Sequence, residues 1–199
     1  MDLTTAIGSV FAAFGLSGAA GLNAFLPLFV SALLARIGVI DLAEPFDALS
    51  STLGLSVLAV LLVADFVGDK VPVVDHALHI AGTVVAPASG AILFTGQTGL
   101  ETDIPTGVAV VLGALTAGSV HAGRAAVRPV STASSAGAGN PVLSLTEDSL
   151  SGGLTALAFI IPILAFLLVI AFFAALALGW RQLRGRRAQR AGRPQPPPR

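Results

Sequence analysis

The chain has 199 residues, of which 54% are hydrophobic, 11% are charged and none is cysteine. In soluble domains about a quarter of the residues are charged. This composition therefore excludes an ordinary globular protein and indicates an integral membrane protein. The net charge is zero, but seven of the 11 basic residues lie within 181–199 while all 11 acids precede residue 181, so an acidic body is joined to a basic tail.

The first uncharged stretch, residues 3–35, is too long for one ordinary membrane span. About 20 helical residues cross a hydrocarbon layer of about 30 Å. The middle of the stretch contains Gly18, Gly21, Asn23 and Pro27, which weaken a continuous helix. We expect two membrane segments joined by a break inside or near the bilayer, and a single kinked helix is the alternative.

Two more apolar stretches follow a connector at residues 37–49. Residues 50–67 are expected to form a span. Residues 76–100 lack acidic residues, lysine and arginine, but they contain Gly82, Pro87 and Gly90, which suit a smooth helix badly. A re-entrant or broken helix is expected there, since irregular backbone at membrane depth needs protein or water around it.

A cleaner span is expected over residues 104–123, with Asp103 as its N-cap and Pro105 in its first turn. The next stretch, residues 129–153, is rich in small and polar residues. We do not expect it to form a lipid-facing helix.

The most apolar segment, residues 154–179, is expected to be the last span. We therefore predict that residues 1–180 form an all-α polytopic membrane domain with about five to six membrane segments, some of them broken or re-entrant. A weak internal repeat is also predicted. The basic, proline-rich tail at 181–199 is predicted to be disordered and cytoplasmic, because basic residues beside a span favour that side. The side of the N-terminus stays open.

The first polar cluster combines three acids, a lysine and two histidines within 15 residues: Asp65, Asp69, Lys70, Asp75, His76 and His79. A charge at the bilayer centre costs roughly 2.5–3.5 kcal/mol on insertion scales, so these groups need mutual pairing, a wet cavity or an interfacial position. A solvated loop at the headgroups is the plainer alternative. Asp75, His76 and His79 are also weak candidates for metal ligands, although histidines at this spacing also occur as ordinary helix-face residues.

The second polar cluster is His121, Arg124 and Arg128, whose spacings of three and four place them on one helix face. This face could clamp an anion or neutralise the acids of the first cluster. It could also be the basic flank of the preceding span.

The third polar cluster contains Asn140, Ser144, Glu147 and Asp148. Ser144 and Glu147 have the spacing of a capping box, which would start the last helix. An alternative is an unwound segment at Asn140 whose carbonyls coordinate a cation.

Five short motifs occur in chain order: Gly21-Leu-Asn23-Ala-Phe-Leu-Pro27-Leu, Asp69-Lys70-Val-Pro72-x-x-Asp75, Pro87-x-x-Gly90-Ala, His121-x-x-Arg124-Ala-x-x-Arg128 and Asn140-Pro141-x-x-Ser144-x-x-Glu147-Asp148. Together they resemble a bacterial integral-membrane family known as domain of unknown function 4126, over roughly residues 5–170. The chain departs from that pattern at Ala86, where the family has arginine, and at Arg124, where lysine is usual. The resemblance implies a multi-pass protein of the bacterial cytoplasmic (inner) membrane, and it implies no activity.

The polar residues beside helix breaks predict a small transporter or channel-like protein, such as a proton-coupled carrier. Its partners would be the lipid bilayer and a small solute, an ion or an anionic lipid headgroup. A homo-oligomer is a further expectation. We expect neither a cofactor nor binding to nucleic acid. An intramembrane enzyme, with or without a metal ion, and a non-catalytic membrane adaptor are the alternatives. The expected pathway residues are Asn23, Asp65, Asp69, Lys70, Asp75, His121, Arg124, Arg128, Asn140, Glu147 and Asp148.

Overall fold

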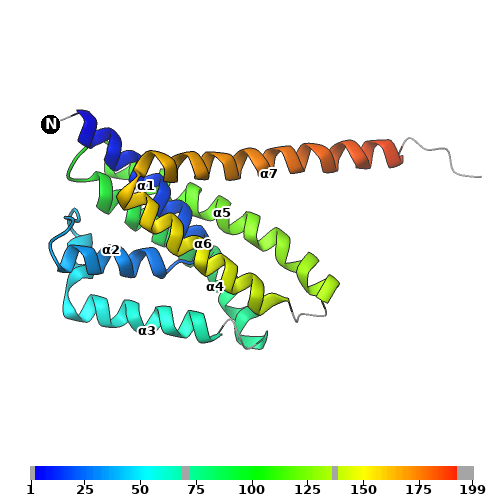
Figure 1. Cartoon of the computed structure of the whole chain (residues 1–199), viewed down its shortest axis with the longest axis horizontal. Helices are drawn as coiled ribbons and strands as arrows, with labels where there is room; N and C mark the ends of the chain where they lie inside the picture. Colours follow the sequence, from blue (N-terminus) through cyan, green and yellow to red (C-terminus); the bar gives the residue numbers. More distant parts are fainter. Residues whose placement is uncertain (1–2, 69–71, 136–138, 192–199) are drawn as a thin grey trace, which may run out of the picture.

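The computed structural model describes residues 3–68, 72–135 and 139–191. The described residues form seven α-helices and a short 3-10 turn, and they contain no strand (Figure 1). The helices are α1 (Leu3–Leu22), α2 (Leu26–Arg36), α3 (Thr52–Gly68), α4 (Pro72–Thr98), α5 (Thr106–Ser135), α6 (Asn140–Ile160) and α7 (Pro162–Ala191), and the turn is η1 (Phe46–Ser50).

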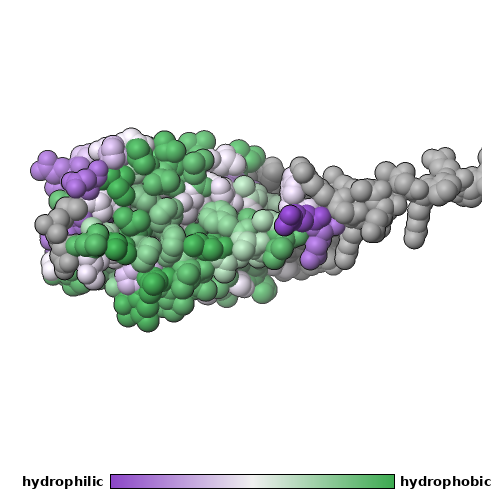
Figure 2. All heavy atoms as spheres, turned by 90° about the horizontal axis from the view of Figure 1, so that it is seen from above, coloured by the Kyte–Doolittle hydropathy of each residue, from purple (hydrophilic) through white to green (hydrophobic). Residues whose placement is uncertain are grey.

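The helices confirm the all-α membrane class. Among the described residues, four are long and apolar enough to cross a membrane: α1, the 77–98 part of α4, the 106–126 part of α5 and the 162–182 part of α7. α2 and α3 are shorter apolar helices. Figure 2 shows a broad apolar surface over the middle of the molecule with hydrophilic atoms gathered toward its two ends. A surface of this kind suits contact with lipid.

Helix α1 is the central packing element, and small residues let its neighbours approach closely. A Cβ on Gly15 would lie 2.7 Å from the Cβ of Ala165 on α7, and a Cβ on Gly21 would lie 2.5 Å from Val120 on α5. The Ser17 hydroxyl donates to the Gly90 carbonyl on α4 at 3.0 Å. Helix contacts in membranes depend on such small residues and on interhelical hydrogen bonds, because lipid supplies little hydrophobic drive.

The predicted break in residues 3–35 is confirmed, since α1 ends at Leu22 and α2 begins at Leu26. The Asn23 side chain caps α2, because its Oδ1 accepts from the backbone N–H groups of Phe25 at 3.0 Å and Leu26 at 2.9 Å. α2 has 11 residues, which corresponds to a length of about 16 Å. It is therefore too short to cross the bilayer by itself.

Helix α4 contradicts the break expected within residues 76–100, because it runs continuously through Pro87. Its glycines serve close packing instead. A Cβ on Gly82 would lie 2.6 Å from the His121 ring, and a Cβ on Gly90 would clash with Ala117 and Gly113. Pro87 is accommodated opposite another small residue, since a Cβ on Gly118 would lie 3.2 Å from its ring.

Residues 129–153 are also more helical than expected. Within them α5 continues to Ser135, and α6 starts at Asn140. α6 has a buried polar face and an exposed apolar one: Ser144, Glu147, Ser151 and Thr155 are buried, whereas Val142, Leu145 and Leu150 are exposed. The polar side chains argued against a lipid-facing helix, but four of them lie on the face that packs against the protein. The capping box is wrong for the same reason, because Ser144 and Glu147 lie inside α6.

The termini of the remaining helices differ from expectation as well. α5 begins at Thr106, so Asp103 and Pro105 precede it. The single span expected at 154–179 is divided at Ile161, whose φ of −138° and ψ of 73° end α6, and Pro162 begins α7. α7 continues to Ala191, so the described part of the expected disordered tail is helical.

The chain alternates between the two ends of the bundle, as Figure 1 shows. The start of α1, the α2–α3 connection and the α4–α5 connection lie at one end, where the Ala43 N–H donates to the Gly96 carbonyl at 3.1 Å. The end of α7 projects beyond the other helices at the opposite end. The two termini of the helical body thus lie at opposite ends. The weak internal repeat stays a prediction.

Candidate functional site

The site is built around Asn23, at the break between α1 and α2. Asn23 is only 2% exposed. Its amide nitrogen donates to Asp65 Oδ2 on α3 at 3.0 Å and to Asp148 Oδ1 on α6 at 2.8 Å. One side chain therefore joins four helices, because its carbonyl oxygen caps α2 while its amide holds two carboxylates.

The polarity of α2 suits this arrangement. The N-terminus of a helix carries a partial positive charge and unsatisfied N–H groups. Here that terminus lies beside Asn23, which in turn holds the carboxylates of Asp65 and Asp148. The positive end of a short helix therefore lies beside the residue that holds two acids.

A second group of charges lies at the same end of α1. Glu147 Oε2 is 2.6 Å from Arg124 Nε and 2.9 Å from Arg128 Nη2, and these side chains are 14% exposed or less. Arg124 also donates through Nη1 to the carbonyl of Leu22, the last residue of α1, at 2.6 Å. Since Glu147 and Asp148 are adjacent on α6, the arginine pair and the Asn23 group are parts of one polar cluster.

The carboxylates of the cluster lie well away from the end of the bundle that holds the α2–α3 connection. α3 rises about 20 Å from Thr52 to Asp65, and α6 rises about 18 Å between Asp148 and Ile160, from that same end. For comparison, the hydrocarbon layer of a bilayer is about 30 Å thick.

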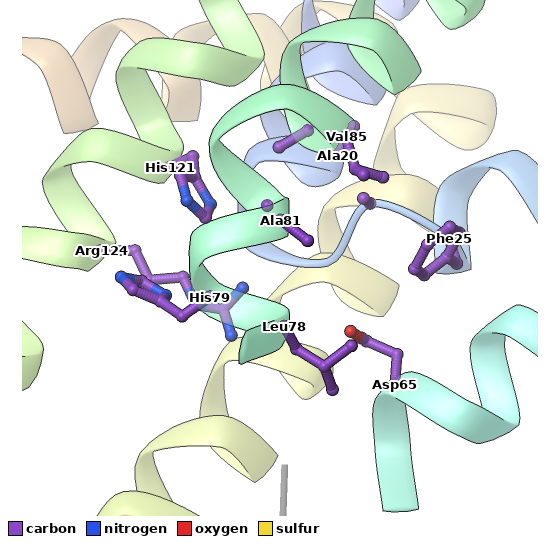
Figure 3. A pocket seen from close by; sticks show the side chains of 12 residues that line it. Ala20, Phe25, Asp65, Leu78, His79, Ala81, Val85, His121 and Arg124 are labelled. Atoms are coloured by element: carbon purple, nitrogen blue, oxygen red, sulfur yellow. The ribbon is translucent and has the colours of Figure 1, made fainter. Parts of the chain in front are cut away.

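A small cavity of about 60 Å³ adjoins the cluster. Figure 3 shows Asp65 reaching toward it from α3, while His121 and Arg124 approach from α5 and His79 from α4. Its remaining walls are apolar or small: Ala20, Ala24, Phe25, Leu78, Ala81, Gly82, Val85 and Ala86. This volume suffices for a few water molecules and excludes larger solutes in this conformation.

Two histidine rings form one wall of the cavity. The rings of His79 and His121 lie 5.1 Å apart between centroids, at an interplanar angle of 33°. His121 is only 4% exposed, and Gly82 leaves the space that its ring fills. The close approach of α4 and α5 therefore depends on a missing side chain at Gly82.

The structure gathers six of the predicted residues into one cluster: Asn23, Asp65, Arg124, Arg128, Glu147 and Asp148. His121 joins it through the cavity wall. Asn140 is the first residue of α6, with Gly139 as N-cap, so the unwound segment expected there is wrong. Asp69 and Lys70 lie outside the described residues, as do the side chains of Asp75 and His76.

The described residues contain no group of three His, Asp or Glu side chains suited to a metal ion. Of the weak metal candidates, only the side chain of His79 is described, and it lies beside His121 rather than within a set of ligands. Metal binding by Asp75 and His76 stays a prediction.

Sequence reasoning missed several contributors to the site. His79 is a member of the first polar cluster and a weak metal candidate but not a predicted pathway residue, and the sequence does not point to the Leu22 carbonyl or to Gly82 as parts of a site. Ser151 was also missed, although its hydroxyl donates to the Ala19 carbonyl at 2.9 Å and so ties α6 to α1 just before the break. The spacing of Ser144, Glu147 and Ser151 on one helix face was the available signal.

The model of the family described as domain of unknown function (DUF4126) matches residues 10–182 of the chain. This match covers most of the chain, which therefore belongs to that family. No curated protein and no solved structure matches it.

Proposed function

We propose that this member of the family is a small transporter for an ion or small polar solute, with its binding site at the break between α1 and α2. One observation carries the proposal: Asn23 holds Asp65 and Asp148 from two other helices at the N-terminus of a short apolar helix. Ionisable residues within membrane segments usually mark an ion, proton or substrate pathway. Breaks of this kind let the backbone take part in binding.

The cavity beside the cluster supports an occluded state of such a carrier. Its volume of about 60 Å³ admits only a few waters. Passage of a solute would then require the helices around it to separate. The breaks at Asn23 and at Ile161 are the natural points for such movement, because each interrupts a membrane helix.

The charge distribution supports an orientation in the bacterial inner membrane. Among the described residues, the end that holds the α2–α3 and α4–α5 connections carries five acids, Asp41, Glu44, Asp47, Glu101 and Asp103, against one basic residue, Arg36. The opposite end receives the basic end of α7. From the positive-inside rule we infer a cytoplasmic C-terminus, with the start of α1 on the other side of the membrane.

A flux measurement tests this function. The purified protein is reconstituted in liposomes of phosphatidylethanolamine and phosphatidylglycerol, and light scattering follows entry of acetate, phosphate, ammonium and sodium salts. We expect at least one of them to enter faster than in empty liposomes. Asp65→Asn should abolish the difference, whereas Asp41→Asn, a change at an exposed acid in the α2–α3 connection, should preserve it. Equal entry with and without protein for all four would contradict the proposal.

A further inference from the structure

We propose that the cavity is a proton-binding site in which water links the imidazole of His121 to the carboxylate of Asp65. This inference rests on the proposed transport function and names the proton as an ion that the site carries. It assigns a role to His121 that the Asn23 cluster does not require.

The first observation is an unsatisfied polar atom. His121 Nε2 is buried and has no hydrogen-bond partner among the described residues. The His121 side chain lines the cavity. Leaving a buried polar group unpaired costs about 1–3 kcal/mol, so a group of this kind normally binds water or a ligand. The cavity volume of about 60 Å³ provides room for that water.

The second observation is the arrangement of charge across the cavity. Asp65 faces it from α3, opposite the wall formed by α4 and α5 (Figure 3). The described titratable or charged groups near His121 come from four helices: Asp65 from α3, His79 from α4, Arg124 and Arg128 from α5, and Glu147 from α6. The cavity residues from α1, α2 and the break between them are Ala20, Ala24 and Phe25, which do not titrate.

This charge arrangement favours a proton over a metal cation. A sodium or similar hard cation needs several oxygen ligands. The α4–α5 wall instead offers two imidazoles and a guanidinium. Water can bridge an imidazole and a carboxylate, and it can pass a proton between them without moving a heavy ion past Arg124.

The proton step is balanced as follows. Neutral His121 accepts a proton at Nε2 from a hydronium ion in the cavity, which becomes water, and His121 becomes an imidazolium. The imidazolium releases that proton to the next water, which becomes hydronium, and the Asp65 carboxylate takes the proton up from it to become a neutral carboxyl group, leaving water. The imidazole returns to its neutral form. The direction is from the wall with Arg124 toward the wall with Asp65, along the electrostatic gradient.

Proton flux into the same proteoliposomes tests this inference. A pH-sensitive dye is enclosed, and valinomycin with a potassium gradient sets a membrane potential, first without and then with each of the four salts. We expect dye acidification with the native protein. His121→Gln, which keeps a hydrogen-bonding group but cannot relay a proton, and Asp65→Asn should each lower the proton flux at least about tenfold. Asp41→Asn should leave it unchanged.

The outcomes separate this inference from the proposed function. Solute entry without any acidification would overturn the proton site and leave the transporter proposal standing. Unchanged proton flux in His121→Gln would also overturn it. If His121→Gln fails to fold, Asp65→Asn decides, because it changes the opposite wall from another helix. In a third outcome no solute enters, but the native protein shows a potential-driven proton flux that His121→Gln and Asp65→Asn both lose. That result would support the proton site and contradict the solute transporter.

Discussion

The side-chain amide of Asn23 donates to the carboxylate of Asp148 at 2.8 Å, joining residues 125 positions apart in the sequence. The contact connects the break in the first hydrophobic stretch to the polar face of α6. Neither feature has a clear role alone. Together they place an ordered polar contact at the break between α1 and α2.

Replacing Asn23 should therefore cost more than losing an ordinary helix cap. Asn23→Ala removes the cap of α2 and two hydrogen bonds to carboxylates, so we expect a loss of about 2–4 kcal/mol in unfolding free energy. Ser51→Ala is the matched control, since its hydroxyl accepts only from the exposed Gly54 N–H and its loss should cost about 1 kcal/mol. Unfolding of both variants in mild detergent measures the difference. Equal losses would contradict the bridging role of Asn23.

Glu147 should be essential for the stability of the arginine pair. Glu147→Gln leaves the buried guanidinium groups of Arg124 and Arg128 without the carboxylate that contacts both. Removing one partner of a buried ion pair typically costs about 3–5 kcal/mol. We expect a clear fall in the thermal midpoint of the purified protein.

Glu44→Gln serves as its control, because this glutamate is exposed in the α2–α3 connection. The double variant Glu147→Gln with Arg128→Gln should recover part of the lost stability by removing one of the charges. A Glu147→Gln protein as stable as the native one would show that these contacts contribute nothing.

A methyl group at position 82 should disturb the histidine wall. In Gly82→Ala the new Cβ would lie 2.6 Å from His121 Cε1, so either the ring or α4 must shift, at a cost of about 1–3 kcal/mol. Gly107→Ala on α5 meets no atom within 4 Å and should be neutral or slightly stabilising. Thermal unfolding and proton flux are both measured for Gly82→Ala and Gly107→Ala. If Gly82→Ala retains native flux and stability, the position of His121 is not critical.

The sequence predicted the class, the first break and many of the residues that the polar cluster brings together, because these depend on local patterns. Charges are costly in a bilayer, so Asp65, Arg124 and Glu147 were already conspicuous in apolar surroundings. Asn23 was conspicuous because it stands among glycines before Pro27. What local patterns could not supply was the pairing, since Asp65 and Asp148, far apart in the sequence, both accept from Asn23.

The wrong predictions share one physical cause. Gly82, Gly90 and Pro87 indicated a broken helix, and the small and polar residues of 129–153 indicated that no lipid-facing helix forms there, because in isolation these residues weaken helices. In the folded chain the glycines admit neighbouring helices, and Ser144 and Ser151 face inward. Tertiary packing decides such cases, and one sequence does not show which surfaces will meet.

Orientation is testable with single cysteines, because the chain contains none of its own. Asp103→Cys lies before α5 and Gln182→Cys lies on the exposed far part of α7. A membrane-impermeant maleimide should label Asp103→Cys in intact cells after outer-membrane permeabilisation. Gln182→Cys should be labelled only after the inner membrane is opened. The reverse pattern would place the C-terminus outside the cytoplasm.

The same cysteine-free background allows the most direct test of the central claim that a wet polar site lies inside the membrane body. Val85 lines the cavity, whereas its neighbour Val84 is 72% exposed on the apolar outer face. A small water-soluble methanethiosulfonate reagent reacts only with thiolates, which require water. We predict that Val85→Cys reacts at least about tenfold faster than Val84→Cys in native membranes. The reason is that water in the cavity lets the thiol at position 85 ionise, whereas the thiol at position 84 faces the apolar exterior. Equal rates, or faster reaction at Val84→Cys, would contradict a hydrated site beside Asn23 and Asp65.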